Sequence, residues 1–410
     1  MMNCIDLFSG AGGLTEGFTQ SGYNILAHVE KEYPACLTLK TRIAYHYLKN
    51  IGNLDIYKNY VKGSISREEL YSNIPQHLLN TVINQEINDD TINNIFDNLD
   101  NLIQNKKIDI IIGGPPCQAY SLVGRSRSKD KMENDERNYL YKQYLKFLEK
   151  YKPNIFVFEN VRGLLTAQKS ELLPKIIKEM ENLGYTVDKQ LLDAKDFGVP
   201  QSRKRLIIIG WKKEIKFSYP IFEKVNNNIT INSLFRDLPS LNPGESVLFG
   251  ELIKENESLI NTNIYEDSWN LLTQHISRPH NERDLEIYKI AIEQKNKGNI
   301  LKYDSNLIPQ RLKTHKNLKS FLDRFKVVDG NSICHTMVAH ISKDGHHYIH
   351  PDIKQIRSLS LREAARIQTF PDSYYFENSR TAAFTQIGNA VPPLMAKIIA
   401  EKIKETFKNY

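Results

Sequence analysis

Short apolar segments that end in glycine-rich or polar turns restrict the fold of this chain more than any other feature. Five such segments occur in the first 212 residues, and helical sequence separates the first from the second. They lie at residues 3–8, 23–29, 108–112, 155–158 and 206–209. Apolar strands separated by helices are typical of a parallel sheet that is covered on both faces. The sequence therefore predicts an α/β fold with a doubly wound, Rossmann-like sheet.

The sequence pattern changes in the second half of the chain. Residues 213–355 have mixed polar sequence, scattered glycine and proline, and few βα units, whereas residues 357–370 and 396–407 again predict helices. A chain of 410 residues has room for roughly two domains. We therefore expect one domain built from residues 1–212 and 356–410, and a second, smaller mixed domain built from residues 213–355.

The composition indicates a globular protein, because 40% of the residues are hydrophobic and 25% are charged. The sequence has no stretch of ~20 apolar residues that could span a membrane, and its start lacks the features of a secretion signal. We therefore expect a cytoplasmic protein. The net charge of +7 gives a mild preference for polyanionic partners. The cysteine and histidine spacing predicts neither a disulfide nor a metal site.

The first candidate site is DLFSGAGG at residues 6–13, directly after a predicted strand. Glycines at this place let the backbone turn tightly and approach a ligand closely. Glu30 ends the next predicted strand, where a carboxylate suits two ribose hydroxyls. The spacing falls short of GxGxxG, so a single nucleoside is favoured over a dinucleotide. The alternative is a tight turn followed by a surface glutamate.

The second candidate site is GGPPCQAYS at residues 113–121, which contains Cys117. Open α/β sheets place ligand chemistry at the carboxyl ends of their strands. The two prolines stiffen the backbone around Cys117, and a thiolate that faces a cleft is a strong nucleophile. The alternative is a buried structural cysteine, as we predict for Cys4 and Cys36 from their apolar surroundings. A Gly-Gly-Pro-Pro run is an unusual choice for core packing.

Two further motifs lie near strand ends. Glu159 begins ENV, and Arg203 and Arg205 lie in QSRKR, just before the strand predicted at 206–209. If that strand runs antiparallel to the others, its start lies at the same edge of the sheet as their ends. That edge would then carry a thiol, a carboxylate and two guanidiniums. Taken singly, Glu159 could be a helix cap or surface acid, and the arginines a solvated basic patch.

Taken in order, these motifs and QIGNAVPP at 386–393 resemble those of the DNA cytosine-C5 methyltransferase family of bacterial restriction–modification systems. The resemblance covers residues 3–30, 108–210 and 356–400. It implies S-adenosyl-L-methionine as methyl donor, no metal, and double-stranded DNA as partner of a monomeric enzyme. RSLSLREAARIQTFPD resembles the motif that follows the recognition domain, and QIGNAVPP resembles the closing motif that returns to the donor pocket.

The resemblance also implies the residues that bind the donor, from the first motif, the next two strands and the closing motif. They are Asp6, Phe8, Ser9, Gly10, Gly12, Gly13, Glu30, Glu86, Asn389 and Val391. Glu86 is a departure, because family members usually carry aspartate at this place. Asp89 is an alternative for the same contact with the adenine.

For the reaction, the resemblance implies that Cys117 adds to C6 of a cytosine that has been flipped out of the duplex. Glu159 would hold N3 and the exocyclic amine, and the carbonyl of Pro116 would accept from that amine. Arg205 would lie near O2 and, with Arg203, complete the QxRxR motif. The segment 120–131 is predicted to close over the DNA; its alternative is a solvated basic loop. Its basic residues are Arg125, Arg127, Lys129 and Lys131.

We expect residues 213–355 to read bases in the major groove, with basic side chains at phosphates. The candidates for phosphate contacts are Arg311, Lys313, Lys316, Lys319, Arg324 and Lys326. One alternative is a tRNA cytosine-C5 methyltransferase, which the length of the region between QSRKR and RSLSLREAAR disfavours. Another is an inactive DNA-binding regulator, which the intact motifs disfavour. A genetically linked restriction endonuclease is a further expectation.

Overall fold

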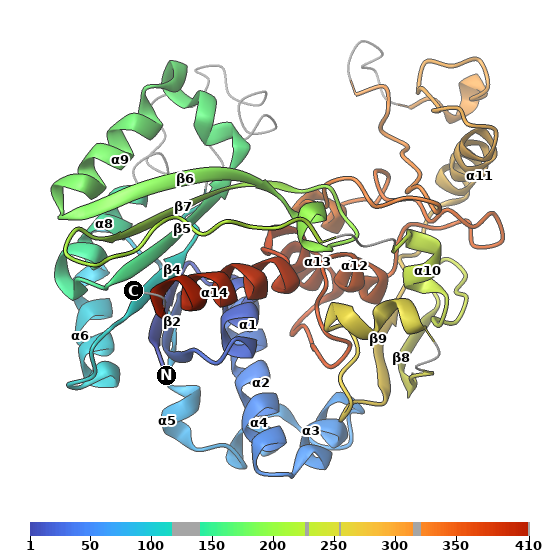
Figure 1. Ribbon diagram of the computed structural model, residues 1–410. Coiled ribbons are helices and arrows are strands. Elements are labelled where there is room, and N and C mark those ends of the chain that lie inside the picture. Colours follow the sequence, from blue (N-terminus) through green and yellow to red (C-terminus); the bar gives the residue numbers. More distant parts are fainter. Residues whose placement is uncertain (117–139, 226–228, 254–255, 315–320, 409–410) are drawn as a thin grey trace.

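The computed structural model describes residues 1–116, 140–225, 229–253, 256–314 and 321–408 (Figure 1). Its centre is a seven-stranded sheet in the order β3-β2-β1-β4-β5-β7-β6. The strands are β1 (Asn3–Leu7), β2 (Asn24–Glu30), β3 (Val82–Asn84), β4 (Ile110–Gly113), β5 (Ile155–Val161), β6 (Tyr185–Asp193) and β7 (Lys204–Lys212).

The strand directions confirm the predicted α/β fold. β1 to β5 form parallel pairs, whereas β7 is antiparallel to both β5 and β6. The start of β7 therefore lies at the edge of the sheet where β4 and β5 end. The prediction that the ENV and QSRKR motifs lie at one edge of the sheet required this antiparallel direction.

Helices cover both faces of the sheet. The helices of this part are α1 (Gly13–Gln20), α2 (Tyr33–Asn50), α3 (Leu54–Val61), α4 (Arg67–Ser72), α5 (Gln76–Leu79), α6 (Ile92–Ile103), α8 (Leu140–Tyr151), α9 (Leu172–Asn182) and α14 (Pro393–Lys408), with 3-10 turns η2 (Arg162–Ser170) and η3 (Ala194–Phe197). On one face, α1 and α14 pack with Ile112 and Val157 in a single apolar cluster. Phe217 and Tyr219, just beyond β7, join the same cluster.

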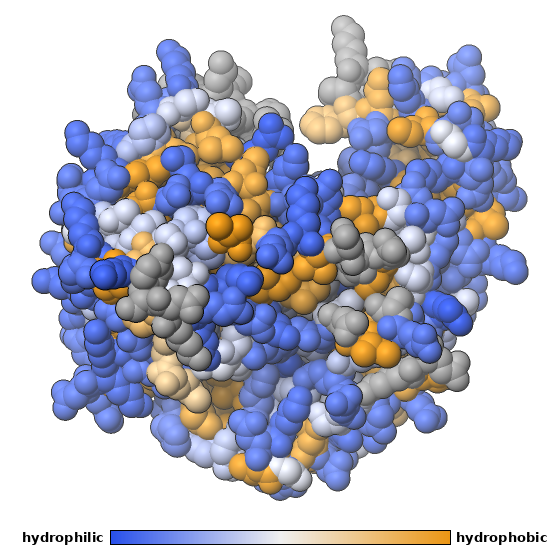
Figure 2. All heavy atoms as spheres, in the orientation of Figure 1, coloured by the Kyte–Doolittle hydropathy of each residue, from blue (hydrophilic) through white to orange (hydrophobic). Residues whose placement is uncertain are grey.

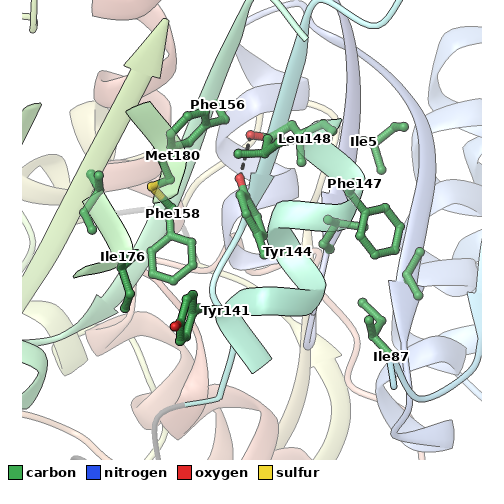
Figure 3. Close-up of a cluster of buried hydrophobic side chains, with 14 of the residues drawn as sticks. Ile5, Ile87, Tyr141, Tyr144, Phe147, Leu148, Phe156, Phe158, Ile176 and Met180 are labelled. Atoms are coloured by element: carbon green, nitrogen blue, oxygen red, sulfur yellow. Dashed lines mark hydrogen bonds between the residues drawn. The ribbon is translucent and has the colours of Figure 1, made fainter. Parts of the chain in front are cut away.

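The opposite face is covered by α6, α8 and α9 (Figure 3). Tyr144 of α8 is fully buried there, and its hydroxyl donates to the carbonyls of Ile111 and Val157 at 3.1 Å each. Phe147, Phe158 and other apolar side chains fill the space around it. Buried on both faces, the central strands are apolar almost throughout, which explains why the sequence pattern was visible.

The remaining elements lie beside the sheet (Figure 1). They are α10 (Ile231–Phe235), β8 (Ser246–Glu251), η4 (Glu257–Thr262), β9 (Leu271–Ile276), α11 (Glu282–Asn296), η5 (Gln310–Leu312), η6 (Ala339–Ser342), α12 (Leu361–Ile367) and α13 (Arg380–Asn389). β8 and β9 form a two-stranded antiparallel sheet. Within the described residues, every helix is too short or too polar to cross a membrane.

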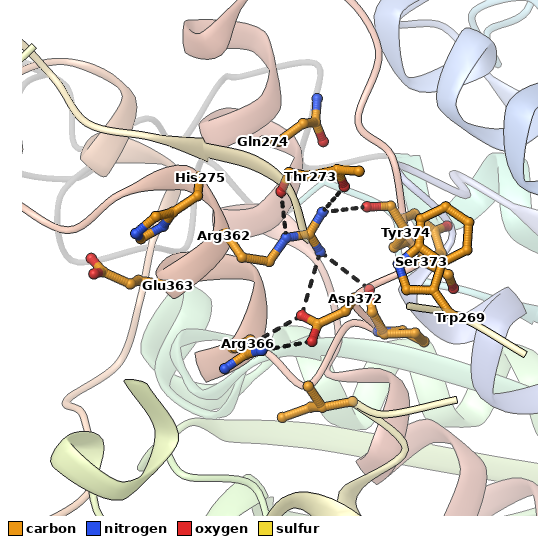
Figure 4. Close-up of polar contacts among 12 residues, drawn as sticks. Trp269, Thr273, Gln274, His275, Arg362, Glu363, Arg366, Asp372, Ser373 and Tyr374 are labelled. Atoms are coloured by element: carbon orange, nitrogen blue, oxygen red, sulfur yellow. Dashed lines mark hydrogen bonds and ion pairs between the residues drawn. The ribbon is translucent and has the colours of Figure 1, made fainter. Parts of the chain in front are cut away.

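Buried arginines tie α12 to residues of the segment 213–355 and to the loop that follows the helix (Figure 4). Arg366 pairs with Asp237 and Asp372 at 2.7 Å each, and Arg362 donates to Thr273 of β9. Ser360 and Glu363 cap the start of the helix reciprocally. Figure 2 shows a hollow at the upper edge of the view, between the side of the molecule that carries β6 and the side that carries α11.

Candidate active site

A buried ion pair lies at the edge where β5 ends and β7 begins. Arg205 Nε is 2.7 Å from Glu159 Oε1, and the two side chains are only 11% and 14% exposed. The antiparallel register pairs Val161 with Arg205, which puts the carboxylate and the guanidinium on neighbouring strands. The sequence prediction that these two motifs meet at one edge is confirmed.

The loop that follows β4 lies directly against this pair. A Cβ at Gly114 would be 2.5 Å from Glu159 Oε2, so a larger residue there would push the Glu159 carboxylate out of this position. Asn160 Nδ2 donates to the carbonyl of Pro115 at 3.3 Å, while Asn160 Oδ1 accepts from the amide of Val161. The start of the GGPPC loop is therefore held beside the carboxylate by the ENV motif itself.

The half-buried Pro116 ends the described part of this loop. Cys117 and the segment 120–131 lie outside the described residues. Asn160 was not singled out from the sequence, although its place in ENV, next to Glu159, was a usable signal. The side-chain amide of Asn160 links ENV to GGPPC, and the sequence pattern alone gave this side chain no role.

The two arginines of QSRKR have different surroundings. Arg203 is fully buried and donates to the main-chain carbonyls of Met337, Gly388 (3.1 Å) and Asn389 (3.4 Å). In the described part of the chain only Arg205 of the two is ion-paired with Glu159. Arg203 instead ties the start of β7 to two segments that come much later in the sequence.

The glycine loop, residues 8–13, connects β1 to α1. Gly10 N donates to Glu30 Oε2 at 2.7 Å, and the other oxygen of Glu30 accepts from the amide of Glu32 at 2.8 Å. Ser9 Oγ donates to the carbonyl of Asp6 at 2.9 Å. The end of β2 is therefore tied directly to the loop, as the spacing of DLFSGAGG and Glu30 indicated.

Close contacts require glycine at two positions of this loop, 12 and 13. Gly12 has φ 81°, and a Cβ there would be 2.7 Å from Leu39 Cδ2. A Cβ at Gly13 would be 2.2 Å from the carbonyl oxygen of Val391. Val391 is buried against the loop, whereas Asn389 is exposed. The structure thus brings the first and the closing motif together from opposite ends of the chain.

The family model for C-5 cytosine-specific DNA methylases matches residues 2–66 and 69–405. The chain belongs to the C-5 cytosine-specific DNA methylase family. It is 46% identical to the type II methyltransferase M.Bpa9945I of Bacillus paralicheniformis, with both chains covered completely. It is 32% identical to the type II methyltransferase M1.HphI of Haemophilus parahaemolyticus, with 97% of this chain and 86% of the relative covered.

A solved structure shares the fold of this methylase. It is that of a prophage-encoded E. coli protein described as a DNA modification methyltransferase, with a TM-score of 0.65, 23% identity and both chains covered completely. The predicted enzyme class, a DNA (cytosine-5-)-methyltransferase, is confirmed by the family match and the relatives.

Two buried carboxylates give the glycine loop of the methylase its electrostatic character. Asp6 is 1% exposed, and its Oδ1 has no hydrogen-bond partner among the described residues. Burial raises the pKa of Asp6 to about 7, with a further contribution from Glu30. Burial likewise raises the pKa of Glu30. A cation would stabilise both carboxylates, whereas a phosphate would be repelled.

Phe8 adds a strained backbone to this loop. Its φ is 56°, a conformation that a bulky side chain rarely adopts, and its ring is half-buried. Such strain is found where a functional site fixes the direction of a side chain.

The two candidates for the adenine contact lie apart. Glu86 is exposed after β3 and pairs with Lys31 at 3.2 Å, next to Glu30 in sequence. Asp89 pairs instead with Lys146 of α8. Of the two, the structure places Glu86 on the Glu30 side.

The remaining cysteines of the methylase have the properties of structural thiols. Cys4 and Cys36 are at most 2% exposed, as predicted, and so is Cys334. Burial raises the pKa of Cys36 and Cys334 to about 12, and that of Cys4 well above its usual range. None of these three thiols is therefore ready to act as a nucleophile near neutral pH.

The basic residues predicted for phosphate contacts are only partly described. Lys316 and Lys319 lie outside the described residues. Arg311 is exposed and pairs with Glu286 of α11 at 2.6 Å. The guanidinium of Arg324 lies 4.3 Å from the ring centroid of Tyr303.

Proposed function

We propose that this methylase transfers a methyl group from S-adenosyl-L-methionine to C5 of a flipped-out cytosine in double-stranded DNA, through a covalent bond between Cys117 and C6. The observation that carries the proposal is the Glu159–Arg205 pair against Gly114 and Pro115. This pair puts an acceptor and a fixed cation beside the loop that leads to Cys117.

The glycine loop fits the donor. The donor carries a sulfonium and an ammonium, and the unpaired Oδ1 of Asp6 offers a buried acceptor for positive charge. The remaining lone pairs of the Glu30 carboxylate would accept from the ribose hydroxyls while the Gly10 amide stays bound, and Phe8 would offer a ring face. Both carboxylates disfavour the phosphates of a dinucleotide, in agreement with the incomplete glycine pattern.

The reaction would begin when the Cys117 thiolate adds to C6 of the cytosine and electron density moves to C5 and N3. Glu159 would hold N3 and the exocyclic amine, and the carbonyl of Pro116 would accept from that amine. Arg205 orients the Glu159 carboxylate and stabilises charge near O2. Fixed charges of this kind typically contribute about 10²–10³ in rate.

Attack of C5 on the donor methyl group would break the methyl–sulfonium bond, and S-adenosyl-L-homocysteine would leave with the bonding electron pair. Solvent would then take up the C5 proton, and the electron pair left behind would re-form the C5–C6 double bond as the C6–S bond breaks and Cys117 leaves as thiolate. The cysteine, the carboxylate and the guanidinium are thus regenerated, so that no external oxidant or reductant is needed.

The base must leave the duplex for this chemistry, at a cost of a few kcal/mol. We propose that the duplex lies in the hollow of Figure 2 and that residues 213–355 read its sequence. The division into residues 1–212 with 356–410 and residues 213–355 belongs to this proposal. Arg311, Lys313 and Lys326 are candidates for phosphate contacts on that side.

We also propose that the enzyme is the modification partner of a type II restriction endonuclease. This rests on the relatives, M.Bpa9945I and M1.HphI, which are type II methyltransferases. Protection of the host genome against a linked nuclease would require no physical contact between the two proteins.

One experiment tests substrate, target site and nucleophile together. Bisulfite sequencing of DNA from a host that expresses the chain is expected to show 5-methylcytosine at one short site. Cys117→Ala is expected to abolish it, and DNA with 5-fluorocytosine at that site is expected to be trapped on Cys117. Transfer to tRNA with none to DNA would overturn the substrate, and a trapped adduct on Cys4, Cys36 or Cys334 would overturn the nucleophile.

A further inference from the structure

We propose that Tyr374 and Arg42 are positioning residues for the methyl donor, because they hold the glycine loop from the side opposite to Glu30. The inference rests on the proposed donor site. Neither residue lies in a motif to which the sequence assigned donor binding, and Tyr374 follows α12 at the far end of the chain.

Tyr374 fixes one peptide of the loop. Its side chain is 1% exposed, and its hydroxyl donates to the carbonyl of Ala11. The other end of the same peptide unit is also held, because Gly12 N donates to the carbonyl of Ser9 at 2.9 Å. A Cβ at Gly12 would be 3.1 Å from the Tyr374 hydroxyl, so the ring lies directly against the loop.

Arg42 of α2 holds the elements on both sides of this contact. Its Nε and Nη2 donate to the two oxygens of Glu16 at 2.8 and 2.6 Å, and Glu16 lies in the first turn of α1, directly after the loop. Its Nη1 donates to Ser373 Oγ at 2.8 Å. The guanidinium carbon is 4.9 Å from the ring centroid of Tyr374. One buried cation thus orients both the helix that follows the loop and the tyrosine that supports it.

A carboxylate from the segment 213–355 completes the network. Glu266 accepts from Ser373 and from Lys49 at 3.0 Å, and it lies 3.8 Å from Arg42 Nη2. Figure 4 shows Ser373 and Tyr374 beside Trp269, three residues after Glu266. A buried ion pair contributes little net stability compared with apolar packing of the same volume. Directional hydrogen bonds differ from apolar contacts in that they fix the orientation of their partners. Here they fix the orientation of Ser373 and Tyr374, and Tyr374 in turn binds the loop.

The part of the loop from Gly10 to Gly13 depends on such support because its own side chains cannot provide it. Gly10, Gly12 and Gly13 have none, and Ala11 has only a methyl group. This part is therefore held by three outside groups: Glu30 at Gly10, Val391 at Gly13, and Tyr374 at Ala11. Removal of the Tyr374 hydroxyl would leave the Ala11–Gly12 peptide held only through the Gly12 amide, and would loosen the main chain against which the donor is proposed to lie.

The test is Tyr374→Phe, with titration of S-adenosyl-L-methionine by calorimetry. We expect the donor Kd and the donor KM to rise about 5- to 20-fold, the usual effect of one lost buried hydrogen bond, with an unchanged KM for DNA. Tyr23→Phe is the matched control, because Tyr23 is also buried and its hydroxyl donates to the carbonyl of Ala400 at 2.9 Å, away from the loop. The control is expected to lose similar thermal stability and to keep the donor Kd.

Arg42→Lys is a second variant that keeps the charge but loses the two-point contact with Glu16. It is expected to weaken donor binding in the same direction, again without a change in the KM for DNA. Wild-type enzyme that fails to bind the donor would overturn the proposed function together with this inference. Wild-type enzyme that binds the donor, with equal affinity in Tyr374→Phe and Tyr23→Phe, would overturn the inference alone.

Discussion

Donor binding is expected to depend on pH through Asp6. Burial raises the pKa of Asp6 to about 7 in the free enzyme, and a bound cation would lower it by about 1–3 units. The neighbouring His28 is neutral in this range, since burial lowers its pKa to about 4. Glu30 also has a raised pKa and contributes in the same direction. Binding of the donor should therefore release protons near pH 6, and its affinity should rise with pH.

The size of the effect follows from the pKa of Asp6. Protonation of the free site weakens binding by a factor of 1 + 10^(pKa − pH), which is about 30 near pH 5.5 and about 1.5 near pH 7.3. With residual protonation in the complex, the net rise is about five- to twentyfold for a pKa lowered by about 1 to 3 units from its value in the free enzyme, the larger rise belonging to the larger lowering. The pH range of the measurement ends at 7.3, below about 7.7, the ordinary pKa of an α-amino group such as that of the donor.

Calorimetry in two buffers with different ionisation enthalpies measures both the affinity and the protons released. Asp6→Asn is expected to bind the donor more weakly and to lose most of the pH dependence; Glu30→Gln keeps Asp6 and should retain it. An affinity of the wild-type enzyme that is flat between pH 5.5 and 7.3, with no proton release, would refute the assignment of the buried Asp6 oxygen to the donor.

The same carboxylate predicts the pH dependence of stability. The pKa of Asp6 is about 7 in the folded state and near the ordinary aspartate value of about 3.9 in the unfolded state, so the folded state binds more protons between about pH 4 and 7. Above pH 7 Asp6 is ionised in both states, and burial of its charge lowers the free energy of unfolding by about 4 kcal/mol relative to a pH below 4. Asp6→Asn should accordingly raise the melting temperature of the donor-free enzyme at neutral pH.

Three further substitutions have defined outcomes. Glu159→Gln keeps the shape but not the charge beside the base, and single-turnover transfer should fall about 10²- to 10⁴-fold with an unchanged donor Kd. Gly17→Ala would put a Cβ 2.4 Å from a main-chain nitrogen of α14, and chemical denaturation should show a loss of about 1–3 kcal/mol. Arg366→Met would leave the buried Asp237 without its cation and Asp372 with only Arg362 at 3.9 Å, and should cost about 3–5 kcal/mol of unfolding free energy.

Matched controls separate these effects from general damage. Gly250→Ala meets only the side chain of Val247, at 3.3 Å, and is expected to be nearly neutral. Arg311→Met breaks an exposed, solvent-screened pair with Glu286 and should leave the free energy of unfolding nearly unchanged. Equal losses in the buried variant and its exposed control would contradict the role assigned to burial. Full turnover in Glu159→Gln would remove that carboxylate from the chemistry.

The sequence predicted those parts of the fold in which local pattern and tertiary position agree. Buried strands are apolar along their whole length and their ends carry polar residues, so the places of Glu30 and Glu159 at strand ends could be read from spacing. The antiparallel direction of β7 was stated only as a condition, because strand direction depends on a connection that the pattern does not show. The structure of residues 213–355 was not predictable in detail, since its elements are short and its core is shared with α12.

Long-range contacts were invisible for a different reason. Arg203 and Arg205 are two residues apart in one motif, yet only the three-dimensional position of residues 337 and 388–389 decides that Arg203 binds carbonyls. Tyr374 reaches Ala11 across 363 positions of sequence. The sequence of the amphipathic helix α2 does not show that Arg42 is buried and ion-paired with Glu16, which directly follows the loop.

The QSRKR motif shows how one short segment joins recognition to chemistry. The amide of Ser202 donates to the carbonyl of Cys334 at 2.9 Å, and Gln201 Oε1 accepts from the amide of Met337 at 2.8 Å. Three residues after Ser202, Arg205 pairs with Glu159. A displacement of residues 334–337, which lie in the segment proposed to read DNA, would therefore be passed through a few covalent bonds to the carboxylate proposed to hold the base. Such a connection needs no separate signalling element, because the segment that leads directly into β7 and Arg205 also carries the contacts with residues 334–337.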